Sequence, residues 1–150
     1  MLRVSKLTDY GTVIMAYLAR HPGQPYAAAE VAGALGVSLP TVSKVLKKLT
    51  RGGLLCATRG AKGGYSLSRP AAAISLTQII DAMEGPIGLT ECGAIPGLCA
   101  QEPDCALRVN WRRVSRLVLK ALDGVTLADM VAPQLQSVRL ALSRPISTAR

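Results

Sequence analysis

The stretch AAAEVAGALGVSLPTVSKVLKKLTRGG, residues 27–53, decides the fold. Its first part, 27–35, has the apolar spacing of a short helix, and Gly36 is well placed to end that helix in a left-handed conformation. Ser38 can then cap a following helix, in whose first turn Pro40 is tolerated. Two helices joined by a short glycine-containing turn have the outline of a helix-turn-helix. The inner face of the second helix would comprise Val42, Val45, Leu46 and Leu49.

The outer face of this second helix carries hydroxyl and ammonium groups, which can meet base edges and phosphates in a major groove. An ordinary solvated helix face has a similar composition, so the charge balance of the chain helps to decide. Residues 1–70 hold ten basic and two acidic residues, a net charge of +8, whereas residues 71–150 hold eight and seven, a net charge of +1. This asymmetry favours a polyanion as partner. The candidate DNA-contacting residues of the helix are Ser38, Thr41, Ser43, Lys44, Lys47 and Lys48.

The next segment, LLCATRGAKGGYSLSRP (54–70), predicts a β-hairpin with strands at 54–58 and 65–68, because its middle supplies the glycines of a turn. Arg59 and Lys62 would lie at the tip. A basic hairpin directly after a helix-turn-helix is typical of a wing, whose tip can reach the minor groove or the backbone. We expect Cys56, in the first strand, to be a small buried hydrophobe.

Three more helices are expected around this module: 7–18, 75–86 with Ser75 as its cap, and 106–122. The last of these has a heptad seam. Two recognition helices must lie about 34 Å apart to read a palindromic operator, so we expect a homodimer along this seam. Its residues are Leu107, Trp111, Val114, Val118 and Ala121.

The expected fold is therefore mainly α with a small β-hairpin wing. A winged helix-turn-helix would occupy 1–70, a cysteine-containing loop and a dimerisation helix 71–132, and a flexible tail 133–150. The chain has no run of about 20 apolar residues, and its start lacks the pattern of a signal peptide. We expect a cytoplasmic protein without a membrane partner. Lasting disulfides are not favoured in the cytoplasm.

The segment ECGAIPGLCAQEPDC, residues 91–105, holds three of the four cysteines and is called the cysteine loop below. Its thiols are Cys92, Cys99 and Cys105, separated by six and five residues. Soft thiolates suit iron–sulfur clusters, whereas zinc sites more often use cysteines two to four residues apart. From the residues alone, a cluster, a zinc site, a redox disulfide and incidental thiols all remain open.

Four segments together resemble a known family over about residues 1–132: SKLTDYG, RGAKGGYSLSRP, SLTQIIDAMEGP and the cysteine loop. They are similar to the winged-helix iron–sulfur transcription regulators, the family of IscR, NsrR and RirA. The start MLRVSKLTDYGTV resembles the regulators encoded with SUF cluster-assembly genes. The resemblance implies a cluster held by Cys92, Cys99 and Cys105, in a repressor whose operator affinity the cluster switches.

The fourth cluster ligand is less evident. IscR-like members place a histidine just beyond the last cysteine, where this chain has Leu107 and Arg108; its only histidine, His21, ends the first helix as a surface or capping residue. NsrR-like members use an N-terminal aspartate from the partner subunit, which here corresponds to Asp9. This ligand set favours 4Fe-4S over 2Fe-2S. Other ligands that can stand in are Glu91, Glu102, Asp104, a thiol or water.

A zinc-sensing, thiol-redox-sensing or nitric-oxide-sensing winged-helix repressor is the alternative, since each would keep the DNA-binding half. An assembly scaffold or cluster carrier would not need the basic helix and wing. An enzyme is not supported, because the sequence offers the thiols no matched base and has no phosphate loop or carboxylate pair.

Overall fold

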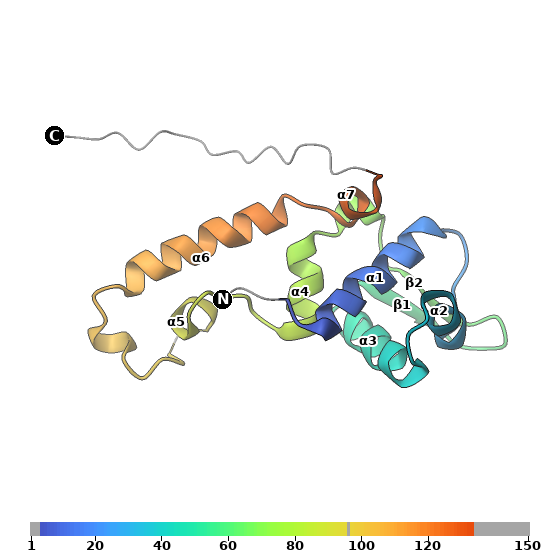
Figure 1. Cartoon of the computed structure of the whole chain (residues 1–150), viewed down its shortest axis with the longest axis horizontal. Helices are drawn as coiled ribbons and strands as arrows, with labels where there is room; N and C mark the ends of the chain where they lie inside the picture. Colours follow the sequence, from blue (N-terminus) through green and yellow to red (C-terminus); the bar gives the residue numbers. More distant parts are fainter. Residues whose placement is uncertain (1–3, 96, 134–150) are drawn as a thin grey trace.

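The computed structural model describes residues 4–95 and 97–133 (Figure 1). The described chain is mainly helical with one antiparallel hairpin, which confirms the expected fold class. No helix in these ranges is long and apolar enough to cross a membrane. The expected tail lies outside the described residues, except for its first residue. The elements are α1 (Lys6–Arg20), α2 (Ala28–Leu35), α3 (Leu39–Arg51), β1 (Leu55–Thr58), β2 (Gly64–Leu67), α4 (Leu76–Glu84), α5 (Glu91–Ala94), α6 (Arg108–Asp123) and α7 (Leu127–Val131).

The stretch 27–53 forms the two predicted helices, α2 and α3. Gly36 ends α2 in the left-handed region, with φ of 63°. Ser38 precedes α3, but its hydroxyl does not cap the helix as expected; it is hydrogen-bonded to Thr41 Oγ1 at 2.8 Å. The predicted inner face of α3 is completely buried, at Val42, Val45, Leu46 and Leu49.

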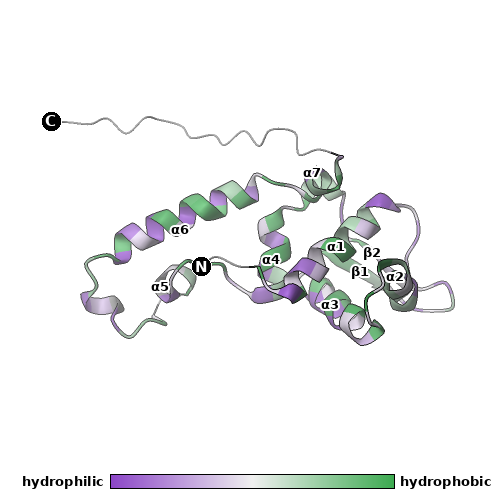
Figure 2. Ribbon diagram, in the orientation of Figure 1, coloured by the Kyte–Doolittle hydropathy of each residue, from purple (hydrophilic) through white to green (hydrophobic). Residues whose placement is uncertain are grey.

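One hydrophobic core joins α1, α3, α4 and α7, so that the helices after the hairpin pack on the helix-turn-helix. Gly52 lets the end of α3 approach α4 closely, since a Cβ there would lie 2.6 Å from the Cβ of Ala82. The helix α6 extends away from this core and carries apolar residues along its length (Figures 1 and 2). Side chains that are fully enclosed in the core include Ile14, Leu46, Ile79 and Leu127.

The hairpin is fixed to the helices at both sides. The backbone N–H of Tyr65 in β2 donates to Tyr26 O at 2.8 Å, and the N–H of Tyr26 donates back to Tyr65 O at 3.0 Å. At the base of the hairpin, the Arg69 guanidinium donates to Gly53 O at 3.2 Å and to Ala73 O at 3.0 Å. Because Gly53 follows α3 closely, these bonds set the orientation of the hairpin relative to α3.

Cys56 is exposed, and the expectation that it is buried is wrong. Successive side chains of a strand point to opposite faces. Leu55 is 3% exposed and belongs to the core, so the next residue of β1 points to the other face. A two-stranded hairpin that packs on a core by one face leaves its other face to solvent.

Hydrogen bonds surround the C-terminal end of α4, a region called the α4 junction below. Thr8 Oγ1 and the backbone N–H of Ser5 donate to Glu84 Oε1 at 2.5 and 2.9 Å. Lys48 Nζ donates to Met83 O at 2.6 Å. The hydrogen bonds from Thr8 and then Ser5 lower the pKa of the Glu84 carboxyl, and the Lys48 charge adds to this effect. The junction therefore ties α4 to the start of α1 and to α3.

Glu84→Gln should lower thermal stability at neutral pH. It should also make thermal stability depend less on pH in the acid range. The folded-state pKa of Glu84 lies below its ordinary value of 4.5, so the carboxylate stabilises the fold fully above that pH. This contribution is lost as the pH falls through the folded-state pKa, so the difference in thermal stability between wild type and variant should become smaller there. Thermal unfolding followed by circular dichroism between about pH 3 and pH 7 measures this difference.

Asp81→Asn is the control, because it removes an exposed carboxyl from the same helix. An identical response of the two variants to pH would contradict the stabilising role given to Glu84.

Candidate nucleic-acid interface and cysteine loop

Three exposed basic side chains lie in line along α3 and form what we call the basic ridge: Lys44, Lys47 and Arg51. Their spacings of three and four residues place them on one side of a helix. Thr41 and Ser43, also predicted to contact DNA, are half-buried. Arg51 was not among the predicted residues, although its spacing from Lys47 is visible in the sequence.

Lys48 differs from the other predicted basic residues of α3. It is half-buried, and its ammonium group donates to the carbonyl of Met83 in the last turn of α4. Carbonyls at the end of a helix lack intrahelical partners and readily accept hydrogen bonds from lysine. The Lys48 ammonium is thus engaged within the protein, where it joins α3 to α4.

The first turn of α3 has a different character from the ridge. Its residues Leu39 and Pro40 are both exposed, and Leu39 is 46% exposed. The hydroxyls of Ser38 and Thr41 form their mutual hydrogen bond beside them. The helix therefore begins with an apolar corner bordered by hydroxyl groups, whereas its charges lie further along.

The tip of the hairpin carries the two predicted basic residues. Arg59 and Lys62 are exposed in the turn that connects β1 to β2, and this turn projects from the body of the domain (Figure 1). Because the base of the hairpin is bonded to Gly53 just after α3, the tip and the basic ridge belong to one fixed assembly. We call the ridge and the tip together the basic surface.

The structure describes the side chains of two cysteines in the cysteine loop. Cys99 and Cys105 are free and half-buried. Cys92 lies in α5, and its side chain is outside the described residues. Gly97 has φ of 83°, a conformation that other residues rarely adopt, so the chain turns sharply between α5 and Cys99. Thiolate donors on a glycine-containing loop fit an iron–sulfur cluster in their chemistry.

A buried serine of α6 fixes the start of the cysteine loop. Ser115 is 3% exposed, and its Oγ accepts a hydrogen bond from the backbone N–H of Leu89 at 3.4 Å. Gly93 of α5 lies against it, since a Cβ at Gly93 would be 2.7 Å from Ser115 Oγ. Ser115 could not be singled out from the sequence, because a heptad pattern identifies only the seam of a helix and treats its other positions alike.

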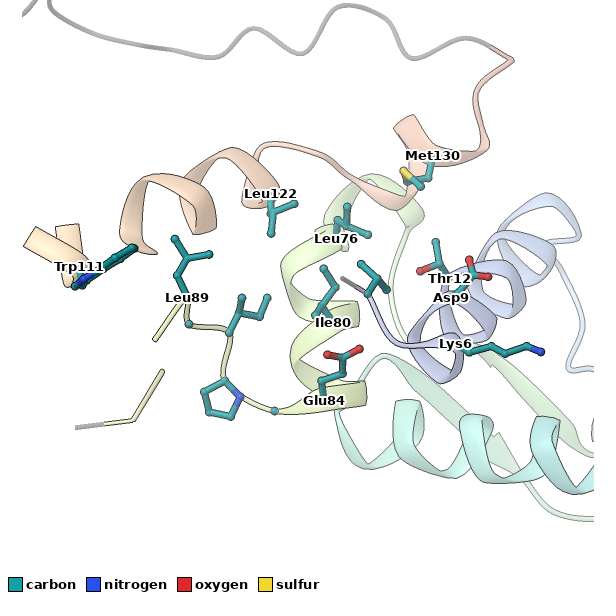
Figure 3. A pocket seen from close by; sticks show the side chains of 15 residues that line it. Lys6, Asp9, Thr12, Leu76, Ile80, Glu84, Leu89, Trp111, Leu122 and Met130 are labelled. Atoms are coloured by element: carbon teal, nitrogen blue, oxygen red, sulfur yellow. The ribbon is translucent and has the colours of Figure 1, made fainter. Parts of the chain in front are cut away.

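Asp9 lines an open cavity of about 960 Å³ between α1, α4, the segment after α4, and α6. Figure 3 shows Asp9 and Thr12 on α1, with Leu89 and Trp111 on the far side of the cavity. Asp9 itself is exposed. Its carboxylate is therefore accessible from outside the chain.

Within one chain, Asp9 does not join the described thiols. Among the described side chains, which exclude that of Cys92, no group of three histidine, cysteine, aspartate or glutamate residues is placed to hold a metal ion. His21 ends α1 as its exposed C-cap, as expected, and its Nδ1 lies 2.8 Å from Tyr17 O. Within the described part of one chain, Asp9, Cys99 and Cys105 are thus not gathered into one site.

The helix α6 exposes the predicted seam. Leu107, Trp111 and Val114 are 58%, 42% and 42% exposed, and Val118 and Ala121 are half-buried. Rows of large apolar side chains on a surface mark sites of interaction. A single chain therefore presents an apolar stripe along the helix that extends from the core.

Comparisons with known proteins agree with this architecture. The family model Rrf2, described as iron-dependent transcriptional regulator, matches residues 4–133. CymR (YrzC), the global cysteine regulator of B. subtilis, is 33% identical, with a TM-score of 0.68 over 87% of this chain and 97% of that chain. IscR of T. potens is 30% identical, with a TM-score of 0.64 over 87% and 86%. The oxidised form of Staphylococcus aureus CymR is 30% identical, with a TM-score of 0.62 over 87% and 97%.

The match to the family model spans all of the described residues, and it confirms the resemblance to this family that was drawn from the sequence. The winged helix, the basic surface and these relatives point to the same class of protein. The chain therefore belongs to the Rrf2 family of DNA-binding transcription regulators, which are not enzymes.

Proposed function

We propose that this protein is a homodimeric cytoplasmic repressor whose affinity for a palindromic operator is switched by an iron–sulfur cluster, and that it controls SUF cluster-assembly genes. The observation that carries the proposal is the pair of half-buried free thiols, Cys99 and Cys105. They lie in a loop that follows the α4 junction and leads directly into α6. The state of these thiols can therefore affect both the DNA-binding head and the dimer seam.

The basic surface is the proposed DNA contact. Lysine and arginine side chains position a protein on phosphates, and hydroxyl groups near the start of a recognition helix can reach base edges. The exposed ammonium and guanidinium groups of α3 and of the hairpin tip suit the first role, and the hydroxyl groups of α3 suit the second. The proposed contacts are Ser38, Thr41, Ser43, Lys44, Lys47, Arg51, Arg59 and Lys62.

Lys47→Ala should weaken binding to every DNA sequence and reduce the slope of log affinity against log salt by about one. Lys48→Ala removes the same charge from the same helix but from a site that is bonded to Met83. It should lower thermal stability and change the salt slope less. Fluorescence anisotropy with a random-sequence duplex, between about 50 and 200 mM salt, measures both slopes.

An unchanged slope for Lys47→Ala would show that Lys47 does not touch phosphate. A slope change in Lys48→Ala as large as that in Lys47→Ala would show that the Lys48–Met83 bond opens on DNA.

The seam of α6 is the proposed dimer interface. Burial of its exposed apolar side chains against a second copy would stabilise the dimer and fix the distance between two recognition helices. The cavity beside Asp9 is lined by Trp111 of the same seam, so a partner packed there would approach Asp9. We propose that Asp9 of one subunit completes the ligand set of the partner subunit's cysteine loop.

The residues that would hold the cluster are three thiolates of one chain, Cys92, Cys99 and Cys105, and the carboxylate of Asp9 from the other. The ligand set favours a 4Fe-4S cluster, whose presence would depend on iron supply, oxidants and nitric oxide. The protein's own contribution is structural: Ser115 holds the start of the loop on α6, and the α4 junction holds its preceding segment against α1 and α3.

The α4 junction offers a route from the loop to DNA. The segment that leads to the cysteine loop begins at Gly85, directly after the last residue of α4. A displacement of the loop would therefore be transmitted to the end of α4, where Met83 accepts a hydrogen bond from Lys48 of α3. Two states of the loop would then differ in the position of the basic ridge. A tenfold change in operator affinity needs about 1.4 kcal/mol of difference between the states, which a few displaced phosphate contacts supply.

Anaerobic purification, with an absorption spectrum and analysis of iron, acid-labile sulfide and zinc, tests the proposal. Broad visible absorbance with matched iron and sulfide is expected. Binding to a duplex from the promoter of a SUF operon, before and after removal of the metal, then tests the switch. Colourless protein that stays free of iron after anaerobic reconstitution would remove the cluster mechanism but leave the DNA-binding assignment in place.

A second candidate is a repressor that uses the same thiols as a redox or zinc switch. It is favoured by the similarity to a global cysteine regulator, of which an oxidised form has been crystallised from a second species. Zinc in the purified protein, or reversible loss of two titratable thiols on oxidation together with a change in DNA affinity, would support this candidate.

A further inference from the structure

The first turn of α3 is the least polar part of the proposed DNA-facing side. Leu39 is 46% exposed, and within 27–70, all of which the structure describes, it is the only exposed large hydrophobic side chain. The other exposed large apolar residues lie on α1, on the cysteine loop, on α6, on α7, or just before α1 and α6. Trp111 and Val114 of α6 belong to the proposed dimer seam, whereas Leu39 lies on the proposed DNA-facing side and needs a separate explanation.

The neighbours of Leu39 bring no charged side chain to this corner. Pro40 follows it and has no backbone N–H to donate. The Ser38 and Thr41 hydroxyls are hydrogen-bonded to each other at 2.8 Å, which uses part of their capacity. The first basic side chain of the ridge, Lys44, comes more than one turn later. This corner of the helix therefore carries no charged side chain.

An apolar corner at this place has a matching partner in DNA. Residues at the start of a recognition helix contact base edges in the major groove. The C5-methyl group of thymine is the apolar feature that the major groove displays, and aliphatic side chains recognise it by contact. Exposed leucines are ordinary on protein surfaces, but this one precedes the basic ridge on the same helix.

We propose that Leu39 determines specificity by packing on the C5-methyl group of a thymine in each operator half-site. This inference rests on the proposed role of α3 as the recognition helix. The basic ridge and hairpin tip then anchor the protein on phosphates, and Leu39 reads one base pair. Removal of that methyl group should weaken binding about fourfold, the effect of one buried methyl-sized group.

The test begins with selection of duplexes from a random-sequence library by the full-length wild-type protein. In the selected duplex, each thymine is replaced in turn by deoxyuridine, which lacks only the methyl group. For wild type, a single replacement at one particular position of a half-site should weaken binding about fourfold, and replacements at the other positions should have less effect. Leu39→Ala should bind the thymine and uracil duplexes equally, and Leu39→Met, which keeps an aliphatic side chain, should still prefer thymine.

The salt dependence of binding provides the control for fold and for general DNA contact. It should be the same in Leu39→Ala and wild type, because Leu39 carries no charge. The inference is overturned if no replacement affects wild type, or if Leu39→Ala keeps the preference. Failure of the wild type to enrich any sequence would instead refute α3 as a sequence-reading helix, and with it the proposed repressor.

Discussion

Cys99→Ala is expected to yield a protein without iron and without visible absorbance after anaerobic purification. An iron–sulfur cluster is held by its thiolate ligands, and loss of one of three leaves an iron exposed to solvent and to exchange. Cys99 is free and half-buried in the cysteine loop, so its removal leaves the core intact. Iron and sulfide analysis, together with the absorption spectrum, measures the effect as loss of nearly all bound iron.

Cys56→Ala is a matched control, since it removes a free thiol that is exposed on β1 rather than placed in the loop. It should keep the full iron content of wild type. Equal loss of iron in both variants would indicate general thiol damage, and full retention in Cys99→Ala would exclude Cys99 as a ligand. Circular dichroism should give the same helical content for all three proteins.

The variant also separates the two candidate functions. Under the cluster proposal, Cys99→Ala should bind the operator duplex as the metal-free wild type does. Under a disulfide switch, the variant should bind equally with and without oxidant, whereas wild type responds. Both outcomes leave the basic surface unaffected, so salt-dependent binding to random DNA should persist in every case.

The sequence was a good guide wherever local periodicity decides the structure. The spacing of Val42, Val45, Leu46 and Leu49 predicted the buried face of α3, and the glycines after Arg59 predicted the turn between β1 and β2. Both features depend on neighbours in the chain. The winged helix could therefore be derived before any contact between distant residues was known.

Contacts between distant segments could not be derived in the same way. The spacing of Lys48 matches an exposed ridge, but only the packing of α3 on α4 brings its ammonium group to Met83. The burial of Ser115 likewise depends on where α5 lies. Cys56 was misjudged for a related reason, because only the placement of the core shows which face of the hairpin is covered.

Val114→Asp is expected to convert the proposed dimer to a monomer and to lower operator affinity about a hundredfold or more. Val114 is 42% exposed in the middle of the seam, and association would bury it. Burial of an unpaired carboxylate costs several kcal/mol, and about 3 kcal/mol corresponds to a factor of about 150 in the dimerisation constant. A monomer contacts one half-site only, so the operator loses the contribution of the second recognition helix. Sedimentation velocity and operator titration measure the two effects.

Val109→Asp makes the same chemical change on the same helix and is the matched control. Val109 is 66% exposed, and at about 100° per residue it lies roughly 140° around α6 from Val114, away from the seam. It should remain dimeric and keep wild-type operator affinity. Dimers in both variants would place the interface elsewhere than on this seam. Monomers in both variants would mean that a negative charge anywhere on α6 disrupts assembly. The contrast between the two valines therefore decides whether the heptad spacing defines the interface.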